Sequence, residues 1–406
     1  MIQVKRRLSS LLVGVQIRKR DFAVLVVVYA SILIWYYVFS GNILKFIPDM
    51  SRGDFLTCNI LFNLIICFVL VLGPLTLKKI NEAQLFCVYC VFMLSGVTLI
   101  FFCANVLLKM VFYYLSGIAF GLGTLLFLVC FWRLTVPEER GRVSGLMLLI
   151  SFLLVTIILP LSEGLSFAET IMLCTALSLG TLTIRLLGPS RAKSASDDDL
   201  RGSNPEKRTV ILYLIPWLVF SFVNATLAKN VSFNVSQLFS PPVRMGFVFA
   251  QAIGTVLGAT IGGMVADFLG RRLPLALGLT FYGLSVALSG LVKTPEFFYL
   301  VYLMNGATWG IASALYILVI FGDLASSNSY AQMCPLGLVV FHFSVGVGQV
   351  LTPLVFQIPL VITSLLSCLL FFVSIMPLIL APETLPLGFR EKIRLKIYIY
   401  FAKRRL

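Results

Sequence analysis

Long apolar runs separated by short polar segments make up most of this chain. Each run has roughly the 20 residues that a helix needs to cross a hydrocarbon core about 30 Å thick. Membrane β-strands are shorter, at about ten residues, and alternate between apolar and polar positions, so the runs predict helices. We expect twelve membrane spans, at residues 22–40, 55–77, 84–104, 107–131, 143–162, 167–187, 209–229, 245–267, 272–292, 297–321, 332–355 and 359–380.

The longest polar segment between spans covers residues 188–208 and is rich in Ser, Asp and Gly, which is typical of a flexible linker. It divides the spans into two sets of six. We therefore expect an all-α polytopic membrane protein with one six-helix bundle at residues 22–187 and a second at 209–381. A basic N-terminal segment, residues 1–21, and a basic tail, residues 382–406, flank the two bundles.

Composition supports a lipid-facing surface. Hydrophobic residues make up 59% of the 406 residues, charged residues only 12%, and the mean hydropathy is +0.99. A water-soluble domain of this length cannot hide so much apolar surface, because its own surface must face water. The expected location is the cell (plasma) membrane, as a multi-pass protein.

The net charge of +15 reflects topology rather than nucleic-acid binding. If the N-terminus is cytoplasmic, 26 of the 32 Lys and Arg residues fall in cytoplasmic segments. The six others lie at or near outer ends: Lys45, Arg52, Lys109, Lys229, Arg244 and Lys293. This skew predicts that both termini are cytoplasmic and that the span count is even.

A glycine- and arginine-rich motif follows the eighth span. It reads Gly263-Met-Val-Ala-Asp267-Phe-Leu-Gly270-Arg271-Arg272. Gly270 permits a tight turn, and Asp267 can cap a neighbouring helix or pair with an arginine. The motif resembles the loop signature of the major facilitator superfamily, Gly-x-x-x-Asp-x-x-Gly-Arg-Arg.

Two further segments are similar to that superfamily. An acidic-Arg-Gly loop with Glu138, Glu139, Arg140 and Arg142 follows the fourth span, and Pro-Glu383-Thr follows the twelfth, as in sugar porters and organic-ion transporters. The loop after the second span departs from the signature, since it ends in Lys78 and Lys79 without an Asp. The loop after the tenth span also departs, because it offers Asp323 in place of an acidic-Arg-Gly loop.

The resemblance implies two bundles that rock around a central cavity, with the cytoplasmic loops as a gate. We hypothesise three sets of gate pairs: Arg271 or Arg272 with Glu138 or Glu139, Glu383 with Arg140 or Arg142, and Asp323 with Lys78 or Lys79. Exposed pairs of this kind are worth about 0–1 kcal/mol each, so a network tunes the populations of the two states.

Polar and aromatic residues within the spans are the candidate cavity. They are Tyr29, Trp35, Asn63, Lys109, Tyr113, Trp217, Asn224, Gln251, Asn305, Trp309, His342 and Gln349. Aromatic rings with amides and no mid-span Asp or Glu suit a neutral or amphipathic organic solute. An anion held by Lys109 or His342 is the alternative, and His342, the only histidine, is the candidate group for a coupling proton.

We predict that the chain is a secondary active or facilitative transporter of a small organic solute, acting as a monomer. Cys87 and Cys90 have CxxC spacing but lie mid-span without a second pair, so we expect no metal or cofactor. A transporter-fold sensor or scaffold without transport is one alternative. An integral membrane enzyme is the other, disfavoured because the chain has a single His and no acidic residue in the middle of a span.

Overall fold

A computed structural model describes residues 17–41, 47, 50–77, 82–166, 168–170, 172–177, 206–325 and 329–385. The helices of the first half are α2 (Lys19–Gly41), α4 (Arg52–Leu77), α5 (Glu82–Phe102), α6 (Val106–Leu134) and α7 (Arg140–Glu163). Those of the second half are α9 (Lys207–Ala225), α10 (Leu227–Leu238), α11 (Pro241–Leu269), α12 (Arg272–Ser289), α13 (Pro295–Ala312), the π-helix η1 (Ser313–Ile320), α14 (Phe321–Asp323), α15 (Tyr330–Met333), α16 (Leu336–Val355) and α17 (Leu360–Leu380).

Within the described residues, ten helices are long and apolar enough to cross a membrane, and they fall on ten of the twelve predicted spans. The spans predicted at 84–104 and 167–187 contain shorter apolar stretches, Val88–Ile100 and Ala168–Leu177. The chain is therefore a multi-pass membrane protein. The linker at 188–208, except for its last three residues, and the tail beyond residue 385 lie outside the described residues.

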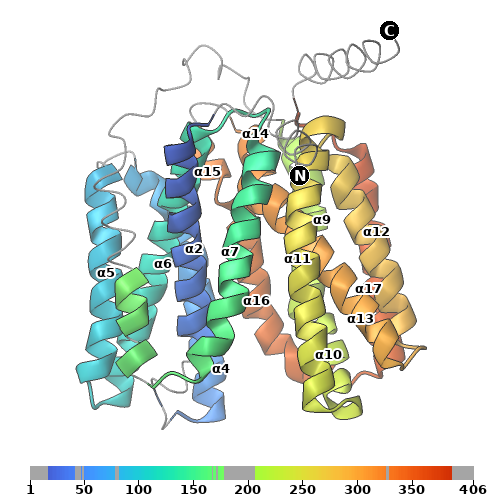
Figure 1. Cartoon of the computed structure of the whole chain (residues 1–406), viewed down its shortest axis with the longest axis horizontal. Helices are drawn as coiled ribbons and strands as arrows, with labels where there is room; N and C mark the ends of the chain where they lie inside the picture. Colours follow the sequence, from blue (N-terminus) through green and yellow to red (C-terminus); the bar gives the residue numbers. More distant parts are fainter. Residues whose placement is uncertain are drawn as a thin grey trace, which may run out of the picture.

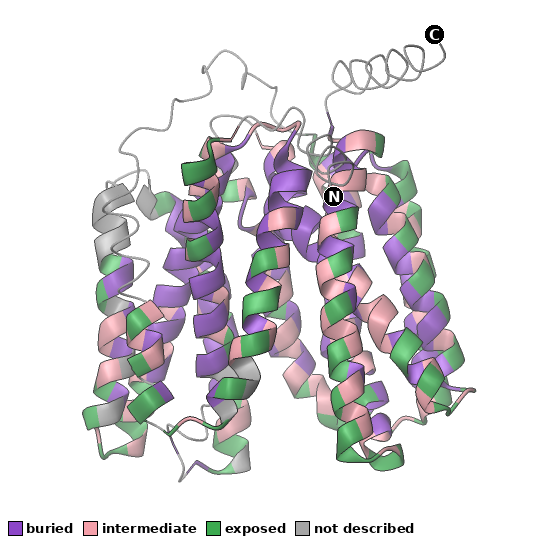
Figure 2. Cartoon of the chain, in the orientation of Figure 1, coloured by how far each residue is buried: buried purple, intermediate pink, exposed green. Residues whose placement is uncertain are grey.

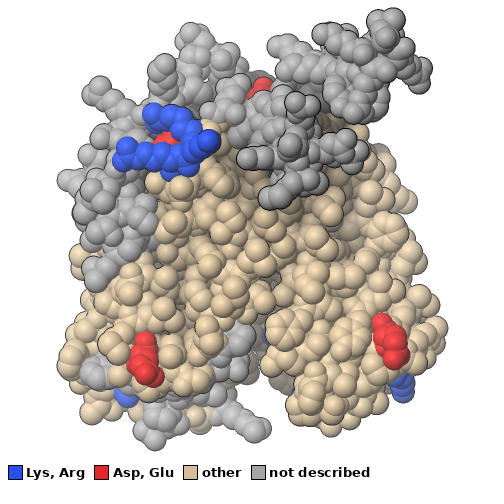
Figure 3. Space-filling view, viewed as in Figure 1, with Lys and Arg blue, Asp and Glu red and all other residues tan. Residues whose placement is uncertain are grey.

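The helices of the two halves stand on opposite sides of the molecule (Figure 1). The halves meet where α4 packs on α16 and where α7 packs on α11. Inward faces are buried and outward faces are exposed along the helices (Figure 2). Large apolar side chains such as Phe68 and Met376 are two-thirds exposed, as expected of surfaces in contact with lipid. In the view of Figure 3, the described charges lie near the two ends of the molecule and leave an uncharged belt between them.

Two helices differ from the regular spans that the sequence predicts. The seventh span does not end at 229, because the apolar stretch runs from Lys207 to Leu238 and is interrupted at Thr226, between α9 and α10. The tenth span changes from α-helix to the π-helix η1 at Ser313, in the half that leads to Asp323. Both irregularities lie next to residues of the candidate functional site, and π-helical turns are frequent at such sites.

Candidate functional site

The two halves touch through glycines where the first turns of α7 meet the last turns of α11. A Cβ on Gly141 would meet the backbone oxygen of Gly263, and a Cβ on Gly145 would lie 2.6 Å from the backbone oxygen of Ala259. Larger residues would force the two backbones apart, so these glycines permit the close contact between the halves.

Asp267 caps α7 from the opposite half of the molecule. Its Oδ1 accepts a hydrogen bond from the backbone N–H of Gly141 at 3.0 Å, and its Oδ2 accepts one from the N–H of Arg142 at 2.8 Å. The Arg142 side chain also donates to Oδ2 from Nε at 3.1 Å. Asp267 thus does both things that its place in the motif suggests, since it satisfies free N–H groups at a helix start and pairs with arginine.

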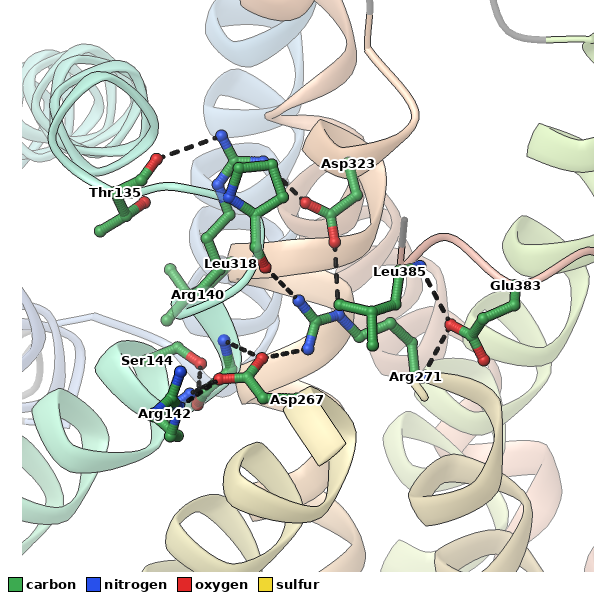
Figure 4. Close-up of polar contacts among 12 residues, drawn as sticks. Thr135, Arg140, Arg142, Ser144, Asp267, Arg271, Leu318, Asp323, Glu383 and Leu385 are labelled. Carbon is green, nitrogen blue, oxygen red and sulfur yellow. Dashed lines mark hydrogen bonds and ion pairs between the residues drawn. The ribbon is translucent and has the colours of Figure 1, made fainter. Parts of the chain in front are cut away.

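Arginine and aspartate side chains alternate across the interface from this point (Figure 4). Arg271 pairs with Asp267 and, through Nε at 3.3 Å, with Asp323. Asp323 in turn pairs with Arg140 of the other half, Nη1 to Oδ1 at 2.7 Å. We call the five side chains Arg142, Asp267, Arg271, Asp323 and Arg140 the charge network, and the end of the molecule that holds them the network end.

The charge network is buried, which corrects the expectation of exposed loop pairs. No side chain in it is more than 4% exposed. Burial alone would lower the pKa of Arg271, but the carboxylates of Asp323 and Asp267 raise it above its ordinary value, so the guanidinium stays charged. Removing one partner from such a network strands a buried charge, at a cost of about 3–5 kcal/mol.

The charged gate residues of the described part of the chain meet at the network end, but the pairs predicted for Arg271, Arg272 and Glu383 are not the ones that form. Glu139 accepts from the backbone N–H groups of Ile17 and Val136, at 3.3 Å each, instead of pairing with Arg271 or Arg272. Glu138 accepts a hydrogen bond from the Arg142 side chain through its backbone oxygen, at 3.1 Å.

Glu383 and Asp323 also have partners other than those predicted. Glu383 accepts from the backbone N–H of Arg271 at 2.8 Å and pairs with Arg272 at 3.7 Å, both from its own half. Asp323 pairs with arginines, while Lys78 and Lys79 lie outside the described residues. Charge signs alone could not choose among several arginines on converging loops.

Gly270 makes the predicted tight turn beside this network. Its φ of 110° lies in a region that side chains rarely adopt, and a Cβ there would meet the carboxylate of Glu383.

Trp132 is a gate residue that the sequence does not reveal. Its ring supports the Arg140 guanidinium, whose Cζ lies 3.5 Å from the ring centroid. Its Nε1 donates to the backbone oxygen of Leu318 in the other half at 3.1 Å, and its ring packs against Gly322. The only sequence signal was a tryptophan next to Arg133, at the end of an apolar run, where aromatic residues are common in any membrane protein.

His342 joins the halves at a second point, nearer the middle of the spans. Its Nδ1 lies 2.9 Å from Oδ1 of Asn63. The Asn63 amide nitrogen donates to the backbone oxygen of Asn59 at 2.8 Å, which turns Oδ1 toward the ring. His342 is therefore the donor, with its proton on Nδ1. Three aromatic rings, of Tyr36, Phe120 and Phe341, surround it edge-on.

A cavity of about 250 Å³ lies within the second half of the chain. Four of the candidate residues line it: Asn224, Gln251, Asn305 and Trp309. Asn224 Oδ1 accepts from the Trp309 indole at 3.2 Å and from the hydroxyl of Tyr282 at 3.3 Å, which holds the aromatic rings of the wall in place. The lining part of α13 precedes η1, so the cavity lies away from the network end. Figure 3 shows the two halves parting at that opposite end.

The other candidates do not line this cavity. Trp217 is fully buried and donates from Nε1 to the backbone oxygen of Gly337 at 2.6 Å. Tyr29, Trp35 and Tyr113 are buried among aromatic rings of the first half. The remaining four are placed as follows: Asn63 and His342 bond to each other, Lys109 is partly buried on α6, and Gln349 is partly buried on α16. Lys229, a lining residue, was assigned to an outer end.

Three solved structures are similar to this chain in fold. The human organic anion transporter MFSD10 (TETRAN) has a TM-score of 0.69 at 12% identity, over 89% of this chain and 99% of its own. The E. coli fucose:proton symporter FucP has a TM-score of 0.67 at 11% identity, over 90% and 100%. A structure of FucP as a major facilitator superfamily transporter in the outward conformation also has a TM-score of 0.67 at 11% identity, over 89% and 98%. No protein-family model matches the sequence, and no curated protein matches it significantly.

Identities of 11–12% show a common fold and nothing narrower. The likeness extends over nearly the whole of each chain. The chain therefore has the fold of the major facilitator superfamily transporters.

Proposed function

We propose that this chain is a secondary active or facilitative transporter that moves a small organic solute across the membrane by alternating access. The observation that carries the proposal is the asymmetry between its ends. The charge network and the glycine contact join the halves at one end, while a cavity with amide and aromatic walls lies toward the other. In secondary transport, a solute site opens toward one side of the membrane while contacts between the two halves close the other side.

The proposed topology has twelve spans in two six-helix bundles, residues 22–187 and 209–381, with both termini and the linker in the cytoplasm. The distribution of Lys and Arg supports it, with 26 of 32 on the proposed inner side. The network end is then cytoplasmic, and the chain is in an outward-open state. The likeness to FucP in its outward conformation agrees with that assignment. We place the protein in the plasma membrane as a monomer.

The solute is proposed from the cavity, because the fold does not fix it. The structural neighbours are described as an organic anion transporter and a fucose:proton symporter, which carry different solutes. Aromatic and amide groups in a cavity of about 250 Å³ support a small amphipathic organic solute. A coupling proton on His342 stays a prediction from the sequence, because in this arrangement the Nδ1–H of the ring is donated to Asn63 across the interface.

Reconstitution tests the proposal. Purified chain in proteoliposomes is assayed for uptake of radiolabelled sugars, amino acids, aromatic carboxylates and their amides, with empty liposomes as the control. We expect saturable uptake of at least one member. A scaffold or sensor would bind a solute without flux, and a membrane enzyme would return it chemically changed. Either result would replace the transport proposal.

A further inference from the structure

Lys229 is one of the residues that line the cavity. The lining residues of α9 and α10 occupy one helical face, with Ser221, Ala225, Ala228 and Ser232 recurring at three- and four-residue intervals. Lys229 belongs to that face, in the first turn of α10 just after the interruption at Thr226. Its side chain is therefore part of the cavity wall and does not lie on the lipid-facing surface.

The ammonium group has no counter-ion among the described residues. No Asp or Glu lines the cavity, and the ion pairs of the described part of the chain do not include Lys229. A lysine inside a membrane span without a partner is costly, and such residues mark solute or ion pathways. A bound anion would offset that cost.

Hydroxyl groups beside Lys229 complete a carboxylate-binding arrangement. Ser232 lies one helical turn away from Lys229 and accepts a hydrogen bond from the Tyr302 hydroxyl at 3.3 Å. Its own proton is then free to be donated to a ligand. An ammonium and a hydroxyl on the same helix face can each donate to one oxygen of a carboxylate, which forms charge-assisted bonds.

Aromatic rings and two amides form the cavity wall beyond Tyr302. Trp309 and Phe341 supply the rings, and Trp309 follows Tyr302 by seven residues on α13, a rise of about 10 Å. Asn224 already accepts from the Trp309 indole, whereas Oδ1 of Asn305 is buried without a hydrogen-bond partner among the described residues. An acceptor left unpaired in a cavity wall marks a position where a ligand can donate.

We infer that this cavity binds an amphipathic organic anion, with its carboxylate on Lys229 and Ser232 and its apolar part against Trp309 and Phe341. The inference rests on the proposed transport function and narrows it, replacing the neutral solute of the sequence-based expectation. It also moves the anion site from Lys109, which does not line the cavity, to Lys229.

Matched pairs of probes test the inference on the full chain. Phenylacetate, 3-phenylpropionate, 4-phenylbutyrate and 5-phenylpentanoate are compared with their primary amides, by isothermal titration and by uptake into proteoliposomes. We expect carboxylates to bind more tightly than their amides in the wild type. Lys229→Met should weaken the carboxylates at least about tenfold, which is about 1.4 kcal/mol, and leave the amides within about twofold. Lys229→Arg should retain the preference for carboxylates.

Lys293→Met is the matched control, because it removes an exposed cation from the same end of the molecule outside the cavity. If no carboxylate is preferred over its amide, or if Lys293→Met weakens carboxylates as much as Lys229→Met, the anion site is wrong. Carboxylates taken up equally by wild type and Lys229→Met would preserve the transport proposal and refute the anion site. Lys229-dependent binding without uptake of any probe would support the anion site and refute the transport proposal.

Discussion

Neutralising Asp267 should open the network end. Asp267→Asn keeps the size of the side chain but removes its charge and turns one acceptor into a donor. Three hydrogen bonds then lose their ionised acceptor across the interface, those from the N–H groups of Gly141 and Arg142 and from the Arg142 side chain. The pair with Arg271 lies within one half and exists whether the end is open or closed.

The size of the effect follows from those bonds. Hydrogen bonds to charged groups contribute about 1.5–3 kcal/mol each, and the amide oxygen recovers part of that. We therefore expect the closed arrangement to lose about 2–4 kcal/mol relative to the open one, which is roughly a 30- to 700-fold rise in the open fraction.

A native cysteine reports the opening. Cys334 is 1% exposed at the network end, close enough to Arg140 for the two groups to interact electrostatically. Its alkylation by N-ethylmaleimide, followed by mass spectrometry of its peptide, proceeds at a rate proportional to the open fraction when opening is rapid and rare. We expect the rate in Asp267→Asn to rise by the same factor as the open fraction.

The matched control is Asp21→Asn. Asp21 is also a buried carboxylate paired with an arginine, but its partner Arg18 is three residues away in the same half. Labelling of Cys334 should stay at the wild-type rate in this variant. If folded Asp267→Asn protein is labelled at Cys334 at a rate within about twofold of wild type, Asp267 does not hold the network end closed. Its charge would then stabilise the closed arrangement by less than about 0.4 kcal/mol.

Three further predictions use the same interface. Gly141→Ala places a Cβ against the backbone oxygen of Gly263 and should raise the labelling rate roughly 5- to 150-fold, for an overpacking cost of about 1–3 kcal/mol; an unchanged rate would mean that the helices are not in contact. Trp132→Phe removes the hydrogen bond to Leu318 and should raise the labelling rate of Cys334 about 2- to 12-fold, less than Gly141→Ala does. His342→Ala should slow solute uptake but retain its pH profile, because the ring acts as a hydrogen-bond donor to the other half; a lost pH dependence would assign the coupling proton to that ring.

Local patterns predicted the spans and the members of the gate. A run of apolar residues has one low-energy conformation in lipid, so length and hydropathy suffice to find most helices. The spacing of the motif predicted the tight turn at Gly270, whereas the helix start that Asp267 caps lies 125 residues away along the chain, in the other half.

The sequence could not predict which charged residues pair, because the pairing depends on how the two halves meet. Arg140 and Asp323 are 183 residues apart, and several arginines and acids of suitable sign converge at the same end. The role of Lys229 was hidden for a related reason. The sequence places it near the outer end of a span, and only the further helix α10 brings it onto the cavity wall.

Burial of the charge network suits a gate better than exposed pairs would. A buried ion pair contributes little net stability, because desolvation of both ions offsets their attraction, yet losing one partner is costly. When the network end opens, Asp267 and Asp323 exchange arginine donors of the other half for water, so the two states can differ little in free energy. The same arrangement penalises half-open states, in which one charge has left its partner without reaching water. A lock built in this way favours two arrangements over the intermediates between them, which alternating access requires.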